Sequence, residues 1–322
     1  SVVHFDVKSA FLNGDLKEVM YMKQPPGFEE GNGNLVCKLK KSIYGLKQAA
    51  HVWNQTLHDV LRKGGFKQSN SDPCLYTKYN NEEWLVYILI YVDDILVASQ
   101  KESNIVRVEK LLSSNFDINN LGKAKHYLSL EIFQDKNTSV INSRPDIAAS
   151  ILILARKVSS PTQEDWSELK RVLKYLKGTQ NYFLRLSHNH VKSNKLVGYA
   201  DANWAEDRVD RKSNSGFVFQ INCGKISWSC RKQTIVALST TEAEFVALSE
   251  ACKEGIWIKQ LLDDMYLPQN YPTIIYEDNQ SCLYMIKEQK LSSRTKHIDT
   301  KLHFVKHHID KGSVSCVYCP TT

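Results

Sequence analysis

The chain has 322 residues, of which 42% are hydrophobic and 24% are charged. This length is enough for two domains with separate cores, and the composition is typical of a globular protein. No apolar run approaches the length of a membrane span, and no signal peptide precedes the first motif, so we expect no membrane partner.

The net charge of +7 is unevenly distributed. Residues 1–143 carry 17 Lys and Arg against 16 Asp and Glu, whereas residues 144–322 carry 25 against 19. A basic excess in the second part fits a polyanionic partner, although a solvated surface explains it equally well. The eight cysteines are scattered through apolar patterns, which indicates reduced thiols in an intracellular setting. Cys316 and Cys319 could belong to a zinc site, but a strand with Val314, Cys316 and Tyr318 on one face is the better explanation, and a single CxxC is a weak signal.

Residues 1–143 alternate short apolar runs with turn signals. The runs "FDVKSAFLNGD", "GNGNLVCKLKKSIYG" and "WLVYILIYVDDILVAS" predict strands, and residues 49–65 and 104–116 predict helices. Strands with helices in no strict βαβ order predict an α+β domain. Because the chain starts at Ser1 within a predicted strand, we expect it to be a piece of a longer protein.

Residues 144 to about 187 read as helical. One face of "EDWSELKRVLKYLKG" collects the apolar residues Trp166, Leu169, Val172, Leu173 and Leu176. The opposite face is basic; it is either the solvated side of a docking helix, which we favour, or a surface that contacts phosphates.

The pattern changes again from Lys195 onward. Three successive strands are predicted in "LVGYADANW", "SGFVFQI" and "KISWSCRK", followed by a long helix over residues 241–265. A strand "TIIYEDN", a short helix from Gln280, a helix over residues 296–310 and a strand "VSCVYC" complete the pattern. This order predicts an α/β domain.

Three aspartates in the first domain stand beside strongly apolar strands. Asp6 lies within "VVHFDVKSAFL", and Asp93 and Asp94 lie at the tip of an apolar hairpin. Each could simply be a turn residue. If the strands are neighbours, however, three carboxylates converge, and divalent cations would be needed to neutralise them. Two such ions could activate the attacking oxygen and stabilise the leaving one in phosphoryl transfer.

A second acidic set occurs in the α/β domain. Asp201 ends the first strand, Glu244 lies near the start of the long helix, and Asp278 ends the "TIIYED" strand. Asp201 could instead be a turn residue. Glu244 and Asp278 could instead be helix caps, but Ser239 with Glu242 and the residue Asn279 can provide those caps. Carboxylates at two strand ends and a helix start are the arrangement that a two-metal nuclease needs.

Several segments resemble a known family. "FDVKSAFLNGDL", "MYMKQPPGF", "VCKLKKSIYGLKQA" and "ILIYVDDILVAS" are similar to the reverse transcriptase of copia-type LTR retrotransposons. "RPDIA", "LKRVLKYLKGT", "GYADANWAEDRVDRKSNSGFVF", "ALSTTEAEFVAL", "EDNQS" and "RTKHID" are similar to the tether and RNase H of the same Pol polyprotein. The resemblance runs over nearly all of the chain in the family's order. It implies a palm remnant at 1–143, a helical tether at 144–194 and an RNase H-like domain at 195–322.

The resemblance also implies roles for individual residues. The metal-binding and catalytic carboxylates would be Asp6, Asp93, Asp94, Asp201, Glu244 and Asp278, with Mg²⁺ or Mn²⁺ as the cofactor. Phe11 would be the aromatic gate that excludes a ribose 2′-OH, and Gln48 would lie near the incoming deoxynucleotide. The implied partners are an RNA template, a DNA primer and an RNA–DNA hybrid, in a cytoplasmic particle or the nucleus.

The sequence departs from the family in four places. The upstream fingers segment is absent, and "SVINSRPDIA" joins blocks that the family separates by several dozen residues, including the thumb region. The family's "KQAPR" reads "KQAAH", and Ser129 replaces a usual glycine. The chain stops before the helix that would supply a fourth nuclease carboxylate, for which Asp299 is a weak candidate. We therefore expect a polymerase-defective chain; the alternatives are a non-catalytic nucleic-acid-binding or domesticated protein, and a relic without function.

Overall fold

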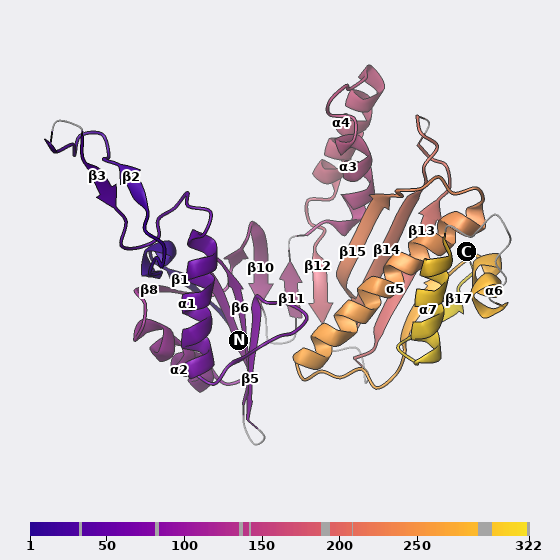
Figure 1. Cartoon of the computed structure of the whole chain (residues 1–322). Coiled ribbons are helices and arrows are strands. Elements are labelled where there is room, and N and C mark those ends of the chain that lie inside the picture. The colour runs from indigo at the N-terminus through magenta and orange to yellow at the C-terminus, as the bar shows by residue number, and fades with distance from the viewer. Residues whose placement is uncertain are drawn as a thin grey trace. The chain divides into compact units, whose positions relative to one another are not determined.

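The computed structural model describes residues 1–31, 34–80, 84–134, 138–141, 143–187, 194–207, 209–288 and 298–320. The chain divides into two compact units, Ser1–Tyr127 and Leu128–Thr322 (Figure 1). Each unit contains a hydrophobic core of its own. Among the described residues, no helix is both long enough and apolar enough to cross a membrane.

The first unit is built on an antiparallel sheet with the strand order β4-β5-β6-β7-β1-β8. Its strands are β1 (Val2–Val7), β4 (Lys67–Gln68), β5 (Leu75–Asn80), β6 (Trp84–Tyr91), β7 (Asp94–Ser99) and β8 (Ile118–Lys123). The helices α1 (Ala49–Lys63) and α2 (Glu102–Ser113) pack on the same face of this sheet, because their buried residues share one cluster with alternate residues of β1, β6 and β7. The predicted α+β architecture is therefore present.

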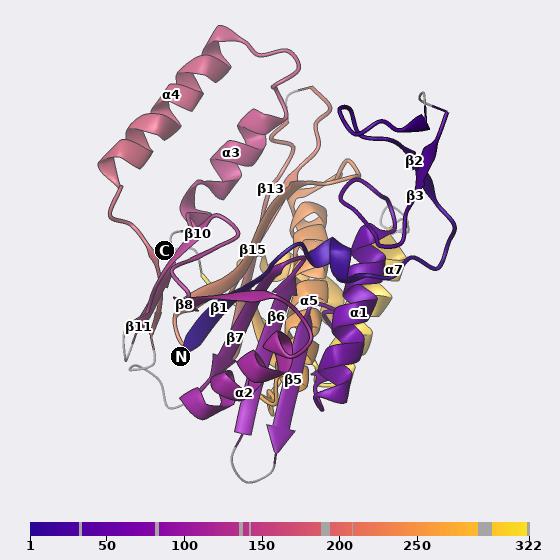
Figure 2. The ribbon, with the colours of Figure 1, turned by 90° about the vertical axis from the view of Figure 1, so that its left-hand side faces the viewer.

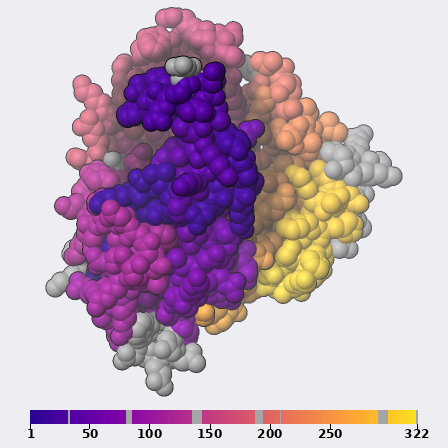
Figure 3. Space-filling model, turned by 60° about the vertical axis from the view of Figure 1, so that its left-hand side comes forward, coloured from indigo at the N-terminus to yellow at the C-terminus, as the bar shows by residue number. Residues whose placement is uncertain are grey.

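Short elements complete the first unit. They are the 3₁₀ helix η1 (Ala10–Asn13), the strands β2 (Tyr21–Lys23) and β3 (Val36–Lys38), and β9 (His126–Tyr127). The β2–β3 hairpin stands out from the six-stranded sheet, and its residues lie at the surface of the unit (Figures 1 and 3).

The second unit begins with an antiparallel ladder and a helical hairpin. The strands β10 (Leu130–Gln134), β11 (Thr138–Ile141) and β12 (Leu184–Ser187) pair in that order. Between β11 and β12 lie the 3₁₀ helix η3 (Pro145–Ile147) and the helices α3 (Ala148–Ala155) and α4 (Gln163–Gly178), which lie side by side (Figure 2). The prediction of helix up to residue 187 was therefore wrong at its end, because "LRLS" alternates apolar and polar residues as a strand does.

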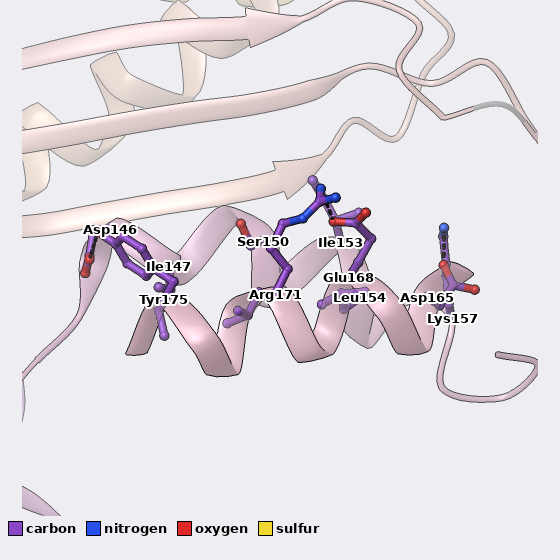
Figure 4. A pocket seen from close by; sticks show the side chains of 11 residues that line it. Asp146, Ile147, Ser150, Ile153, Leu154, Lys157, Asp165, Glu168, Arg171 and Tyr175 are labelled. Carbon is purple, nitrogen blue, oxygen red and sulfur yellow. Dashed lines mark hydrogen bonds and ion pairs between the residues drawn. The ribbon is translucent and has the colours of Figure 1, made fainter. Parts of the chain in front are cut away.

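The predicted apolar face of α4 is only partly covered. Trp166 and Leu173 are 53% and 54% exposed, and no apolar residue of α3 or α4 is fully buried. A groove of about 440 Å³ runs between the two helices (Figure 4). Ion pairs and hydrogen bonds at its ends, such as that of Tyr175 with Asp146, hold the helices together.

A five-stranded mixed sheet forms the rest of the second unit, with the order β15-β14-β13-β16-β17. Its strands are β13 (Leu196–Asn203), β14 (Asn214–Ile221), β15 (Gly224–Lys232), β16 (Thr273–Glu277) and β17 (Val314–Tyr318). The strand β14 pairs antiparallel with both β13 and β15. On the other side, β16 runs parallel to β13, and β17 runs parallel to β16. The long helix α5 (Thr240–Asp264) covers one face, with α6 (Gln280–Glu288) and α7 (Asp299–Asp310) beside it (Figure 1).

The close approach of α5 to this sheet depends on a glycine. Phe219 is fully buried, and its ring lies against Gly198 of the neighbouring strand and Gly255 of α5. A Cβ at Gly198 would lie 2.4 Å from the Phe219 ring, so only glycine leaves room there. This packing fixes the helix that carries Glu244 against the strand that carries Asp201.

Candidate metal centres

Three elements of the second unit bring carboxylates together. Asp201 lies near the end of β13, and Asp278 directly follows β16, the parallel neighbour of β13. Glu244 comes from the first turns of α5. One carboxylate oxygen from each lies within 4.8 Å of the other two, and this is the only such group of three acidic, histidine or cysteine ligands among the described residues.

The caps of the neighbouring helices are supplied by other residues. The Ser239 hydroxyl accepts a hydrogen bond from the Glu242 N–H at 3.2 Å, and Glu242 in turn accepts one from the Leu238 N–H. The Asn279 side chain accepts from the Cys282 N–H at 2.9 Å and so begins α6. Neither helix therefore needs Glu244 or Asp278 as its cap.

The pKa values of this cluster reflect burial and mutual repulsion. Burial, followed by the charge of Asp278, raises the pKa of Asp201. Burial, followed by the charges of Asp201 and Asp278, raises the pKa of Glu244 to about 8. The adjacent Glu277 is 1% exposed, and its pKa is also raised to about 8, by burial and then by Glu244. The part of these three shifts that comes from repulsion between carboxylates would be relieved by a bound cation, since a cation would stabilise the charged forms.

The donor set fits a hard divalent cation. All three groups offer carboxylate oxygens, the ligand type that Mg²⁺ and Mn²⁺ prefer. The Glu244 Oε2 atom is buried and has no hydrogen-bond partner, which is costly unless something positive is bound there. Asp201, Glu244 and Asp278 are thus the residues that could hold the ion.

The three aspartates that the sequence singled out in the first unit lie on two neighbouring strands and the turn between β6 and β7. Asp6 of β1 lies directly opposite Asp94 of β7 in the antiparallel register. Asp93 occupies the β6–β7 turn, and its carbonyl accepts a hydrogen bond from the Val7 N–H at 3.0 Å. The three aspartates are therefore neighbours, but their oxygens are spaced more widely than those of the second unit, since no second group within 4.8 Å occurs among the described residues.

The turn that carries Asp93 is strained. Val92 has a φ of 56°, which is unfavourable for a β-branched residue. Its carbonyl accepts a hydrogen bond of 2.6 Å from the indole of Trp53, a side chain of α1 that is 2% exposed. The core of the unit thus fixes the turn in this conformation.

The two predicted nucleotide-binding residues lie in separate elements. Phe11 is in η1, with its ring centroid 4.4 Å from that of Tyr44. Gln48 directly precedes α1 without capping it through its side chain, and its side chain amide contacts the Met20 sulfur at 2.8 Å. Partial desolvation, followed by the charges of Asp93 and Asp6, raises the pKa of Tyr44, so Tyr44 lies near these two aspartates.

Asp299 does not join the second cluster. It begins α7, its side chain is 46% exposed, and it contacts His303 at 3.3 Å. Cys316 lies on β17 and Cys319 directly after it, and they belong to no ligand group among the described residues.

Sequence reasoning missed two residues next to the acidic sets. Glu277 precedes Asp278 and, by strand alternation, lies on the core face with Ile275. His4 precedes Asp6 by two residues and donates a hydrogen bond to Asp94. Both could have been found, because residues two apart on a strand share a face and adjacent ones do not.

The fold defines a class: a reverse-transcriptase palm followed by an RNase H-like unit. In structure the chain is similar to the foamy viral protease–reverse transcriptase that was solved in complex with RNA/DNA hybrid, with a TM-score of 0.54 and 12% sequence identity. The match covers 100% of this chain and 44% of that one, and it supports the fold alone.

The sequence comparisons point to the same class of protein. Residues 1–154 match the family "Reverse transcriptase (RNA-dependent DNA polymerase)". The chain is 32% identical over 386 aligned residues to the retrovirus-related Pol polyprotein from transposon TNT 1-94 of Nicotiana tabacum, covering 99% of this chain and 29% of that protein. It is 31% identical to the Pol polyprotein from transposon RE1 of Arabidopsis thaliana, in an alignment that covers 98% of this chain and 25% of that protein. Over nearly its whole length the chain is thus similar to Pol polyproteins of copia-type retrotransposons, and it spans less than a third of these relatives' length.

Proposed function

We propose that the chain carries the RNA-directed DNA polymerase and ribonuclease H modules of a copia-type retrotransposon, with polymerisation impaired. The modules would be a palm at 1–143, a tether at 144–194 and the nuclease at 195–322. Their partners would be an RNA template, a DNA primer, deoxynucleotides and an RNA–DNA hybrid, inside the cell. The observation that carries the nuclease assignment is the convergence of Asp201, Glu244 and Asp278 with a buried, unpartnered Glu244 oxygen.

The chain's own residues would act mainly by placing charge. Bound Mg²⁺ or Mn²⁺ would polarise the scissile phosphate and activate water. Asp201 and Asp278 hold their oxygens at the ends of parallel strands, so the distance between them is set by the sheet. Glu244 supplies a carboxyl that α5 and the buried Phe219 fix against that edge. Positioning of this kind accounts for much of the rate in phosphoryl transfer.

Reduced polymerase activity is proposed for a different reason. The similarity to the tobacco polyprotein extends over 386 aligned residues, against 322 in this chain, so at least 64 of those positions have no residue here. If they include the segment that grips template and primer, Asp6, Asp93 and Asp94 would lack a substrate held in line. We expect weak or no extension of an oligo-dT primer on poly-rA, and loss of any residual extension in Asp93→Asn. Processive extension by the purified chain would contradict this part of the proposal.

The nuclease assignment is tested by cleavage of a hybrid. The full chain should cut the labelled RNA strand of an RNA–DNA hybrid slowly in Mn²⁺, because no fourth carboxylate joins the three that converge among the described residues. Asp278→Asn should abolish the cutting, whereas Asp263→Asn, at an exposed position near the end of α5, should retain it. Cutting that persists in Asp278→Asn would refute the assignment, and no cutting by the parent would favour a nucleic-acid-binding protein without nuclease activity.

A further inference from the structure

The strongest additional feature is the contact of His4 with Asp94. His4 and Asp6 are two residues apart on β1, so they share the face of the sheet opposite the buried Phe5 and Val7. The register pairs Asp6 with Asp94 and His4 with Leu96, which places His4 one diagonal step from Asp94. The His4 Nε2–H group donates a hydrogen bond of 2.7 Å to Asp94 Oδ1.

Packing fixes the position of the His4 ring independently of this bond. The side chain is 13% exposed, compared with 31% for Asp94. Its ring meets Tyr127 edge-on, with centroids 5.9 Å apart and an interplanar angle of 81°, and Tyr127 is itself 7% exposed. Because packing fixes the His4 ring, the hydrogen bond orients the more exposed Asp94 carboxylate.

Asp6 has a weaker counterpart of this contact. The Asn119 side chain amide of β8 donates to Asp6 Oδ2 at 3.3 Å. Each of the two opposed aspartates is thus contacted on one oxygen by a side chain from the sheet. Carboxylates that bind metal ions in proteins are commonly oriented by such hydrogen bonds, and removal of the donor weakens metal binding.

We propose that His4 is a positioning residue for the first metal centre: it holds Asp94 through Oδ1 and thereby directs Oδ2 towards the cation shared with Asp6 and Asp93. This inference rests on the proposed function of those aspartates as metal ligands. His4 itself does not contact substrate or the ion. Its effect should therefore appear in the affinity of the first centre for metal, without a matching loss of folding stability.

The test measures Mn²⁺ affinity by the electron paramagnetic resonance signal of the free ion, in the full chain. Asp201→Asn and Glu244→Gln are combined as a background that removes the second centre. In this background, His4→Asn should weaken Mn²⁺ binding about tenfold or more, because its shorter side chain cannot reach Asp94. His4→Gln places an N–H donor near the former Nε2 and should stay within about threefold of the background. His126→Phe, at an exposed histidine of the same unit, is the matched control.

His4→Phe keeps the ring against Tyr127 but removes the donor, so it should also weaken binding, with urea unfolding unchanged. If His4→Phe does not fold, the pair His4→Asn and His4→Gln decides alone. Equal or tighter Mn²⁺ binding in His4→Asn, while Asp94→Asn weakens it, would overturn the positioning role and leave the metal centre intact. Absence of Mn²⁺ binding in the background, with no change in Asp94→Asn, would instead refute the metal centre and the inference together.

Discussion

The raised pKa of Glu244 predicts that folding of the second unit depends on pH and on metal. Glu244 is 9% exposed and lies beside two other carboxylates, and its pKa of about 8 compares with 4.5 for an unperturbed glutamate. Between these two values the folded chain retains a proton that the unfolded chain has released. Stability therefore falls as pH rises from about 4.5 to about 8, where the folded carboxyl also ionises.

The size of the effect follows from the shift. Each pH unit in this window costs about 1.4 kcal/mol, so the penalty at pH 7 is roughly 3 kcal/mol relative to pH 4.5. Glu277 has a similar pKa of about 8 and is coupled to Glu244, so the two penalties do not simply add. Glu244→Gln removes the charge at nearly constant volume and should recover roughly 2 kcal/mol or more at pH 8, with little gain at pH 5.

Hydrogen exchange of α5 peptides, measured without metal at pH 5 to 8 and corrected for intrinsic exchange, reports the stability of this unit alone. The parent should lose protection as pH rises, Glu244→Gln should lose less, and Glu288→Gln, at an exposed glutamate of α6, should follow the parent. Added Mg²⁺ should restore protection in the parent at pH 8 but only weakly in Glu244→Gln. The reasoning would be refuted if protection of α5 in the parent did not change with pH. It would also be refuted if protection in Glu244→Gln fell with pH as steeply as in the parent.

Three further substitutions test the packing that positions the two centres. Trp53→Phe removes the 2.6 Å bond to the Val92 carbonyl and should lower the unfolding free energy of the first unit by about 1–3 kcal/mol in urea titrations, whereas Trp166→Phe, at an exposed tryptophan, should not. Gly198→Ala places a Cβ 2.4 Å from the Phe219 ring and should destabilise the second unit by about 1–3 kcal/mol, while a Cβ at Gly216 meets nothing closer than 3.8 Å, so equal losses would contradict the packing argument. Ser239→Ala removes the cap of α5 and should cost about 1 kcal/mol in thermal unfolding, a loss not expected for Ser167→Ala within α4.

Much of the second centre could be predicted from local signals. Strand alternation and helix periodicity located β13, α5 and β16, and the capping residues Ser239 and Asn279 left Glu244 and Asp278 available as metal ligands. The convergence of these carboxylates then follows from one fact of topology, the parallel pairing of β13 with β16. Parallel neighbours bring their carboxyl ends to the same edge of a sheet, so two strand-end aspartates in this fold must be close.

Other features that sequence reasoning missed depend on contacts between distant elements. The strain at Val92 is held by Trp53, which is 39 residues away, and the His4–Asp94 bond spans 90 residues. Trp166 lies on the predicted apolar face of α4 and is nevertheless exposed, because helical periodicity identifies an apolar face but not whether a partner covers it. Tertiary packing determines both the exposure of a side chain such as Trp166 and the backbone strain at Val92, so the local sequence pattern does not predict either.

The two centres also differ in how their charge repulsion is handled. In the second unit, three elements fixed by one core hold carboxylate oxygens within 4.8 Å of each other, and the raised pKa values of Asp201 and Glu244 record the cost. In the first unit the aspartates are spaced more widely, and hydrogen bonds from His4 and Asn119 orient two of them. A cation at the second centre therefore relieves an existing electrostatic penalty, and the wider spacing in the first unit leaves less repulsion for a cation to relieve. Metal should consequently stabilise the fold of the second unit more than that of the first, and mutations of orienting side chains should affect metal affinity chiefly at the first centre.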